Sequence, residues 1–291
     1  VEDGRIAAVG RLKDLPDAPG ATLIDAMGCA VSPGLVDSHV HPVFGDWTPR
    51  QNQLGWIESF LNGGVTTMIS AGEVHLPGRP KDIVGLKALA IAAQRSFANA
   101  RIAGAKVLAG APVLEADADI IGHINGGHTA LAEGQVCELC ERSSRAIEIV
   151  HNGNERIAIA AVQAARDLKQ LHRVILGTDS PAGSGVQPLG ILRMVSLLSS
   201  LGGIPAEQAL CMATGNTARI RNLDSGLIEV GCAADFVFMD RAQHSAGRDL
   251  LDSIRLGDLP GIGMVMVDGA VRCTRSRNTP PAERVPEILG H

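Results

Sequence analysis

The sequence predicts an α/β protein in which helices cover both faces of a parallel sheet, with a smaller β-rich domain formed by the two ends of the chain. Between residues 34 and 218, short apolar strands alternate with helices, the pattern of a parallel sheet with helical crossovers. Residues 1–33 and 219–291 instead contain short β-like segments separated by glycine turns. Polar residues directly follow several core strands, where the functional residues of such folds collect.

The core elements follow one another in a regular order. Pro33-Gly34 precedes the first core strand, which ends in His39-Val40-His41. We expect further core strands at 65–70, 106–111, 119–123, 146–151 and 174–179, and helices at 46–63, 81–101, 130–142, 155–171, 189–201 and 205–214. In the terminal regions we expect strands at 4–10, 21–25, 234–240 and 264–271, a helix at 246–257 and an exposed tail at 275–291.

Composition excludes several classes of protein. The 291 residues are 45% hydrophobic and 20% charged, which is typical of a globular chain with a large core. The net charge of -5, without a basic block, argues against a nucleic-acid partner. No apolar run approaches the ~20 residues of a membrane span and no signal peptide is visible, so we expect a cytoplasmic protein with no membrane partner. Because the chain starts without methionine, we also expect residues before Val1.

The six cysteines are dispersed and do not form the pattern of a disulfide scaffold. Cys137-x-x-Cys140 could indicate a metal or redox site, but it falls in a predicted helix and no second pair follows it. We interpret it as two cysteines on successive turns of a helix in a reducing compartment.

The strand-end histidines and carboxylates are the candidate site. Residues i and i+2 of a strand point to the same face, so His39 and His41 present two imidazoles side by side, and these can share one metal ion at roughly 2.0–2.1 Å. The alternative is a surface strand with two unrelated histidines. His123 and Asp179 also directly follow strands. Alone, His123 would be a satisfied polar residue and Asp179 a helix N-cap, but their shared location favours metal ligands.

Several motifs, in their order and spacing, resemble the metal-dependent amidohydrolase superfamily over nearly the whole chain. They are Val-Glu-Asp-Gly-Arg-Ile at the start, Pro-Gly-Leu-Val-Asp-Ser-His-Val-His at 33–41, Gly-Gly-Val-Thr-Thr at 63–67, Gly-Thr-Asp-Ser at 177–180, Ala-Thr-Gly-Asn-Thr-Ala at 213–218 and Gly-Cys-Ala-Ala-Asp-Phe-Val at 231–237. Within it, further runs at 63–72, 77–82, 122–127, 188–193 and 276–282 resemble the enamidases.

The resemblance implies a (β/α)8-type TIM barrel at 34–218 and a small β-sandwich made of 1–33 and 219–291. It implies a site for two divalent metal ions, Zn and/or Fe, and hydrolysis of a cyclic amide, 6-oxo-1,4,5,6-tetrahydronicotinate, to 2-formylglutarate and ammonia. It also implies a homo-oligomer, since the family often forms tetramers. The cyclic substrate would carry a carboxylate. Substrates with hydantoin, dihydropyrimidine or imidazolone rings are the alternative within the superfamily.

Amide hydrolysis at neutral pH needs a metal that polarises the carbonyl and lowers the pKa of water toward ~7. By resemblance, His39, His41 and Asp179 would hold one ion and His123 a second. Asp179 would accept the proton of water and pass it to the leaving nitrogen. Arg79 is the candidate for the substrate carboxylate, because guanidinium binds carboxylate in a bidentate fork; a solvated loop arginine is the alternative.

The sequence departs from the family pattern in one respect. We count six barrel strands where eight are expected, and residues 114–118 join two strands with no room for the crossover that parallel neighbours need. The two missing units would carry the bridging ligand and one further histidine, and Glu115 matches neither position. Either a segment is absent from this sequence, or the chain is an inactive relative that serves as a scaffold. We favour the first, because an open barrel exposes strand edges.

Overall fold

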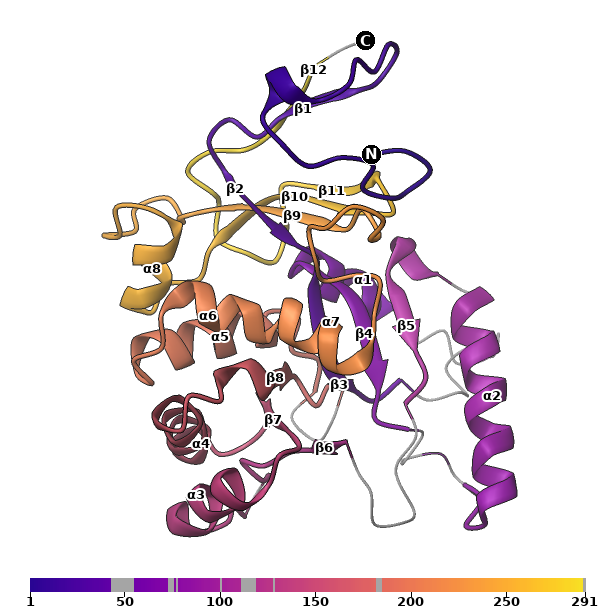
Figure 1. The fold of residues 1–291 in the computed structure, drawn as a ribbon, viewed down its shortest axis with the longest axis vertical. Helices are drawn as coiled ribbons and strands as arrows, with labels where there is room; N and C mark the ends of the chain where they lie inside the picture. The colour runs from indigo at the N-terminus through magenta and orange to yellow at the C-terminus, as the bar shows by residue number, and fades with distance from the viewer. Residues whose placement is uncertain are drawn as a thin grey trace.

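The computed structural model describes residues 1–42, 55–72, 76, 78–99, 101–110, 119–127, 129–181 and 185–289. Parallel strands and their helices form the lower part of the molecule, and the two chain ends form antiparallel sheets above them (Figure 1). One continuous core joins the two parts, since Leu35 and Met68 of the parallel strands pack in the same cluster as Val237 and Ile262 of the upper sheet.

The parallel strands form two three-stranded sheets. One contains β3 (Leu35–Val40), β4 (Val65–Ser70) and β5 (Lys106–Leu108), and the other contains β6 (Ile120–Ile121), β7 (Ala146–Val150) and β8 (Val174–Gly177). Strands β3, β4, β7 and β8 are almost continuously buried, as expected for strands covered on both faces.

The two sheets adjoin through β3 and β8. The His41 amide donates to Ser180 O at 2.8 Å, and the Asp179 amide donates to His39 O at 2.8 Å. The strand order is therefore β5-β4-β3-β8-β7-β6. All six predicted core strands are present, and the described residues contain no strand between β5 and β6. Residues 111–118, where the predicted shortfall falls, lie outside the described residues, as does Glu115.

Helices flank the parallel strands (Figure 1). They are α1 (Gly55–Asn62), α2 (Ile83–Asn99), α3 (Glu133–Arg142), α4 (Glu155–Asp167), α5 (Gly190–Ser200), α6 (Ala206–Met212) and α7 (Gly215–Arg221), with 3-10 turns η1 (Leu12–Asp14), η3 (Ile102–Gly104) and η4 (Leu171–Arg173). In α4, Ile157, Ala161 and Ala165 recur at helical spacing and are fully buried. Asn154 caps this helix by accepting from the Ile157 amide at 3.1 Å. Cys137 and Cys140 lie on α3, so the predicted helix there is confirmed.

The chain ends lie side by side in the upper part (Figure 1). Strands β2 (Ala30–Pro33), β9 (Phe236–Asp240), β10 (Gly261–Val267) and β11 (Ala270–Thr274) form an antiparallel sheet in the order β11-β10-β9-β2. Strand β1 (Leu23–Asp25) pairs with β12 (Glu287–Leu289), and helix α8 (Leu250–Leu256) lies between β9 and β10 in the chain. No described helix is long and apolar enough to span a bilayer.

Two sequence-based expectations for the chain ends were wrong. Residues 4–10 form only isolated bridges, because Gly4 turns the chain at a φ of 77° and only Ile6 is buried among them. Residues 275–289 are more than an exposed tail. Ala282 is buried, and the Glu283 amide donates to Arg241 O at 2.9 Å, so the proline-rich segment runs along the end of β9 before β12 pairs with β1.

Candidate active site

Four predicted site residues meet at the carboxyl ends of the parallel strands. His39 and His41 lie at the end of β3, Asp179 follows β8 and His123 follows β6. Asp179 is the common partner of the three rings. Its Oδ1 lies 2.6 Å from His41 Nε2 and 3.6 Å from His39 Nε2, and its Oδ2 lies 3.1 Å from His123 Nε2. The His39 ring centroid lies 5.0 Å from that of His41 and 5.7 Å from that of His123.

A buried carboxylate beneath the cluster sets the register of β3 against β8. Asp37 is fully buried, and its oxygens accept from the Thr178 amide at 2.9 Å and from Thr178 Oγ1 at 2.6 Å. Gly177 makes the close approach possible, because a Cβ there would lie 2.4 Å from His39 Cβ. A bulkier residue at 177 would therefore force β8 away from His39.

The backbone at two of the site residues is unusual. Asp179 has a φ of 61° and His123 a φ of 57°, the left-handed region that few non-glycine residues adopt. Such conformations persist where the surrounding structure fixes them, and they cluster at functional sites. Asn152 supplies part of that support at Asp179, since its Nδ2 donates to Asp179 O at 2.8 Å.

The electrostatics of the site follow from burial and from the close contacts. Burial opposes the charge of Asp179, but hydrogen bonds with His123 and His41 and the positive charges of the nearby rings lower its pKa well below the usual range. Burial also opposes protonation of His39, yet the hydrogen bond and charge of Glu148 raise the pKa of this ring. Burial raises the pKa of Asp37 to about 7.

Glu148 is the member of the site that sequence reasoning missed. It lies in the middle of β7, its side chain is 3% exposed, and its Oε2 lies 2.8 Å from His39 Nδ1. Its Oε1 accepts from Ser38 Oγ at 2.6 Å. A signal was present in the sequence, because a lone acidic residue interrupts the otherwise apolar run Ala146–Val150.

The donor set fits one divalent ion. The ligand atoms of His39, His41 and Asp179 all lie within 4.8 Å of one another, and imidazole with carboxylate suits Zn and Fe. The contacts of His41 Nε2 and His39 Nε2 with Asp179 Oδ1 use the same atoms that would face an ion. For a second ion, the described part of the chain offers His123 and the remaining oxygen of Asp179, which is not a complete set.

Arg79 is the remaining candidate from the sequence. Among the described residues, no hydrogen bond or ion pair joins Arg79 to the four side chains. Arg79 follows β4, and its Nε is buried without a hydrogen-bond partner in the described structure. His151 is partly buried, with its Nδ1 3.4 Å from Asn152 Oδ1. His75 lies outside the described residues.

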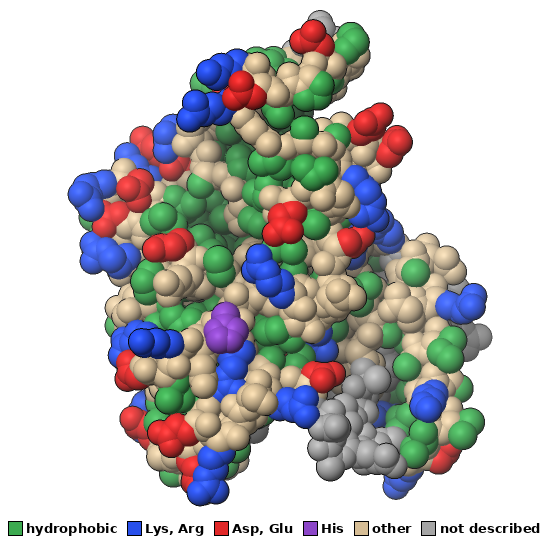
Figure 2. Space-filling model, viewed as in Figure 1, with side chains coloured by type: hydrophobic (Ala, Val, Ile, Leu, Met, Phe, Trp, Pro, Cys, Tyr) green, Lys and Arg blue, Asp and Glu red, His purple; other side chains and the backbone are tan. Residues whose placement is uncertain are grey.

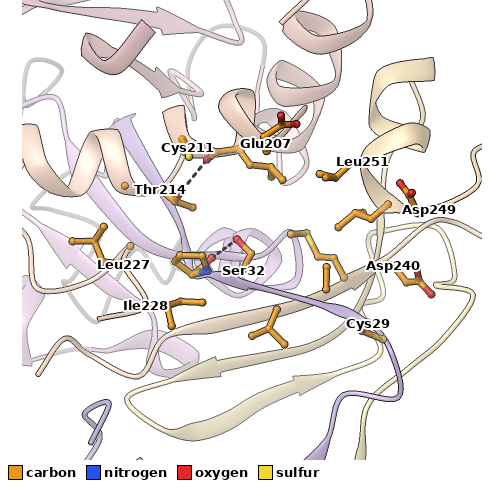
Figure 3. Close-up of a pocket in the computed structure, with 18 of the residues that line it drawn as sticks. Cys29, Ser32, Glu207, Cys211, Thr214, Leu227, Ile228, Asp240, Asp249 and Leu251 are labelled. Carbon is orange, nitrogen blue, oxygen red and sulfur yellow. Dashed lines mark hydrogen bonds between the residues drawn. The ribbon is translucent and has the colours of Figure 1, made fainter. Parts of the chain in front are cut away.

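A separate groove of about 550 Å³ borders the amino end of β3. It runs between β2 and helices α6 and α8, and Ser32, Cys211 and Leu251 are among its lining residues (Figure 3). Figure 2 shows hydrophobic side chains in the hollow between the upper sheet and these helices. Since the His–Asp cluster lies at the opposite end of β3, this groove is not part of the candidate site.

A parallel sheet of βα units that gathers histidines and a carboxylate at the carboxyl ends of its strands defines the class of TIM-barrel-type metal hydrolases. The amidohydrolase family model matches residues 122–272. A curated relative, enamidase from Eubacterium barkeri, is 40% identical over 358 residues, which cover 99% of this chain and 93% of the relative. The chain belongs to the amidohydrolase family, so the predicted family is confirmed.

Solved structures agree with this assignment. A crystal structure of enamidase superposes with a TM-score of 0.92 at 39% identity, covering 99% of this chain and 93% of that chain. A dihydroorotase structure superposes with a TM-score of 0.56 at 20% identity, covering 94% of each chain, which supports the fold alone.

The alignment with the enamidase of Eubacterium barkeri also contains positions that this chain lacks. It runs over 358 positions and the chain has 291 residues, so at least 67 aligned positions have no counterpart here. A βα unit of a TIM barrel takes about 30 residues. The difference is therefore close to two such units.

Proposed function

We propose that this chain is an enamidase-like, metal-dependent hydrolase that cleaves the C–N bond of a cyclic amide. The substrate we propose is 6-oxo-1,4,5,6-tetrahydronicotinate, and the products are 2-formylglutarate and ammonia. The observation that carries the proposal is the contact of His39, His41 and His123 with Asp179 at the strand ends, in a chain 40% identical to an enamidase.

In the proposed site, His39, His41 and Asp179 hold one divalent ion, Zn or Fe, and His123 faces a second. A bound ion would polarise the amide carbonyl and lower the pKa of an adjacent water. The described residues supply no further ligand that would bridge two ions.

Asp179 is the proposed catalytic base and acid. Its carboxylate accepts a proton from the attacking water and passes it to the ring nitrogen as the C–N bond breaks. Ring opening leaves a carboxylate and an enamine, and a second water converts the enamine to the aldehyde and ammonia. Asn152 fixes the Asp179 backbone, and the left-handed φ of Asp179 turns its side chain toward the three rings.

Arg79 is the proposed partner of the substrate carboxylate. It follows β4, whose carboxyl end lies next to that of β3, and its buried Nε has a donor hydrogen without a partner in the described structure. A guanidinium in such a position gains a charge-assisted hydrogen bond when a carboxylate binds.

We also propose that two βα units belong between β5 and β6, which would complete an eight-stranded barrel over 34–218. The at least 67 unmatched positions of the alignment support this proposal. A sandwich formed by 1–33 and 219–291, a homotetramer and a cytoplasmic location stay predictions. Light scattering of the purified protein measures its oligomeric state.

The test is hydrolysis by the purified chain after loading with Zn²⁺ or Fe²⁺. We expect ammonia release from 6-oxo-1,4,5,6-tetrahydronicotinate and slower or no release from hydantoin, dihydropyrimidine and imidazolone rings. Faster turnover of one of those rings would replace the proposed substrate. No bound metal together with no hydrolysis of any cyclic amide would contradict the proposal and leave the scaffold interpretation, which the incomplete second metal site favours.

A further inference from the structure

Glu148 has no role in the hydrolysis proposed above. This side chain lies among the apolar residues of β7 and is 3% exposed. Burial of a carboxylate is costly unless the group is paired and hydrogen-bonded. Both oxygens have partners at the end of β3, since Oε1 accepts from Ser38 Oγ at 2.6 Å and Oε2 lies 2.8 Å from His39 Nδ1. The carboxylate of Glu148 therefore contacts β3, the strand that carries His39.

The contact determines which nitrogen of His39 is available to a metal. An ionised carboxylate only accepts hydrogen bonds, so Nδ1 must carry the hydrogen that faces Glu148. In a neutral ring, Nε2 then has the free lone pair, and Nε2 is the atom that faces Asp179 at 3.6 Å. The neighbouring chain leaves room for this arrangement, because a Cβ at Gly122 would lie 3.3 Å from Glu148 Oε2.

We propose that Glu148 is a positioning residue that holds His39 in the Nδ1–H tautomer and aims Nε2 at the metal. This inference rests on the proposed metal site at His39, His41 and Asp179. Ser38 helps to hold the Glu148 carboxylate in place, since its hydroxyl donates to Oε1, the oxygen that does not contact His39. Outer-shell carboxylates of this kind raise the basicity of the ligand and fix the ring orientation.

Zn²⁺ affinity of E148A and E148Q, measured by competition with a chelator, tests the proposal. We expect E148A to bind Zn²⁺ about 10–100-fold more weakly than the wild type, and E148Q to lose less, because an amide oxygen still accepts from Nδ1–H. The Co²⁺-loaded variants should also show an altered visible absorption spectrum. The matched control is D240N, which removes the buried carboxylate of Asp240 on β9, a group paired with Arg284, and should keep wild-type affinity.

Wild-type affinity in a folded E148A would overturn the proposal. A second measurement needs no variant: ¹⁵N-histidine NMR of the wild type should show His39 with its hydrogen on Nδ1, and an Nε2–H tautomer would overturn the proposal even if both variants fail to fold. If the proposed metal site itself were wrong, the wild type would bind no Zn²⁺. The tautomer of His39 could still be measured in that case, so the two failures can be told apart.

Discussion

His41 Nε2 lies 2.6 Å from Asp179 Oδ1, although 138 residues separate the two in the sequence. The contact exists because β3 and β8 are neighbours, with Val40 and Ser180 paired in parallel. It joins the first and last parallel strands of the chain at their carboxyl ends, so removal of either partner affects metal binding and proton transfer together.

Asp179→Asn should lower kcat for cyclic amide hydrolysis by about 10³-fold, within the range that loss of a positioned acid–base group produces. Asparagine keeps the size of the side chain but cannot take up the proton of water. Steady-state kinetics with the metal-loaded enzyme measure the loss. The control is Asp167→Asn, which removes an exposed carboxylate paired with Arg166. A kcat within a few-fold of wild type would remove Asp179 from the mechanism.

His39→Ala should remove the ion held by this cluster. The ring offers one of three ligand atoms, so affinity should fall by more than the roughly 10–100-fold that an outer-shell partner contributes. Equilibrium dialysis against Zn²⁺, followed by elemental analysis, gives the metal content. His172→Ala, an exposed histidine in η4, should retain the wild-type content. Equal metal content in the two variants would show that the ion binds elsewhere.

Asp240→Asn should destabilise the protein at neutral pH. Burial opposes the charge of Asp240, but hydrogen bonds and charge from Arg284 lower its pKa, so the folded state favours the carboxylate. A lowered pKa contributes stability above the unfolded value of about 4, and this contribution is lost as the pH falls through the lower folded value. We expect Tm to fall by about 4 °C at pH 7 and by less in acid. An equal difference at pH 7 and pH 3 would contradict this origin.

The sequence predicts the site better than it predicts the ends of the chain. The His-x-His spacing places two rings on one face of β3, and the strand-end positions of His123 and Asp179 bring them to the same rim. These are local signals whose consequence is fixed by the parallel topology. Glu148 could not be placed in this way, because it lies in the middle of β7 and not at a strand end.

The pairing of the two chain ends also could not be predicted from the sequence. Nothing local in residues 287–289 shows that they pair with Leu23–Asp25, because the partner strand is chosen by long-range packing. At 4–10 the error is of the opposite kind, since a local pattern predicted a strand that the protein does not form. Its apolar alternation is local, but the protein buries only Ile6 there, so the pattern does not form a sheet.

Asn125→Ala should lower stability by about 1–3 kcal/mol, because it leaves the buried amide of Val150 without its side-chain acceptor. Val150 O keeps a second donor, the Gly153 amide at 3.3 Å. Asn125 is 1% exposed, donates from Nδ2 to Val150 O at 2.8 Å and accepts from the Val150 amide at 3.0 Å. It thereby links the segment after β6, which carries His123, to the end of β7. Urea unfolding at pH 7 measures the loss. A change below about 0.5 kcal/mol, as for an exposed site, would show that water replaces the amide at no cost.

Arg79→Ala should raise KM for the carboxylate-bearing cyclic amide by about 10–100-fold while kcat changes little, because a hydrogen bond between charged groups contributes about 1.5–3 kcal/mol to binding. The buried Nε without a partner in the described structure is the group available to the carboxylate. The control variant is Arg95→Ala, which removes an exposed arginine of α2. A control substrate without the ring carboxylate should be turned over alike by the wild type and Arg79→Ala. If KM for the carboxylate substrate is unchanged, Arg79 is a loop arginine and another cation receives the substrate.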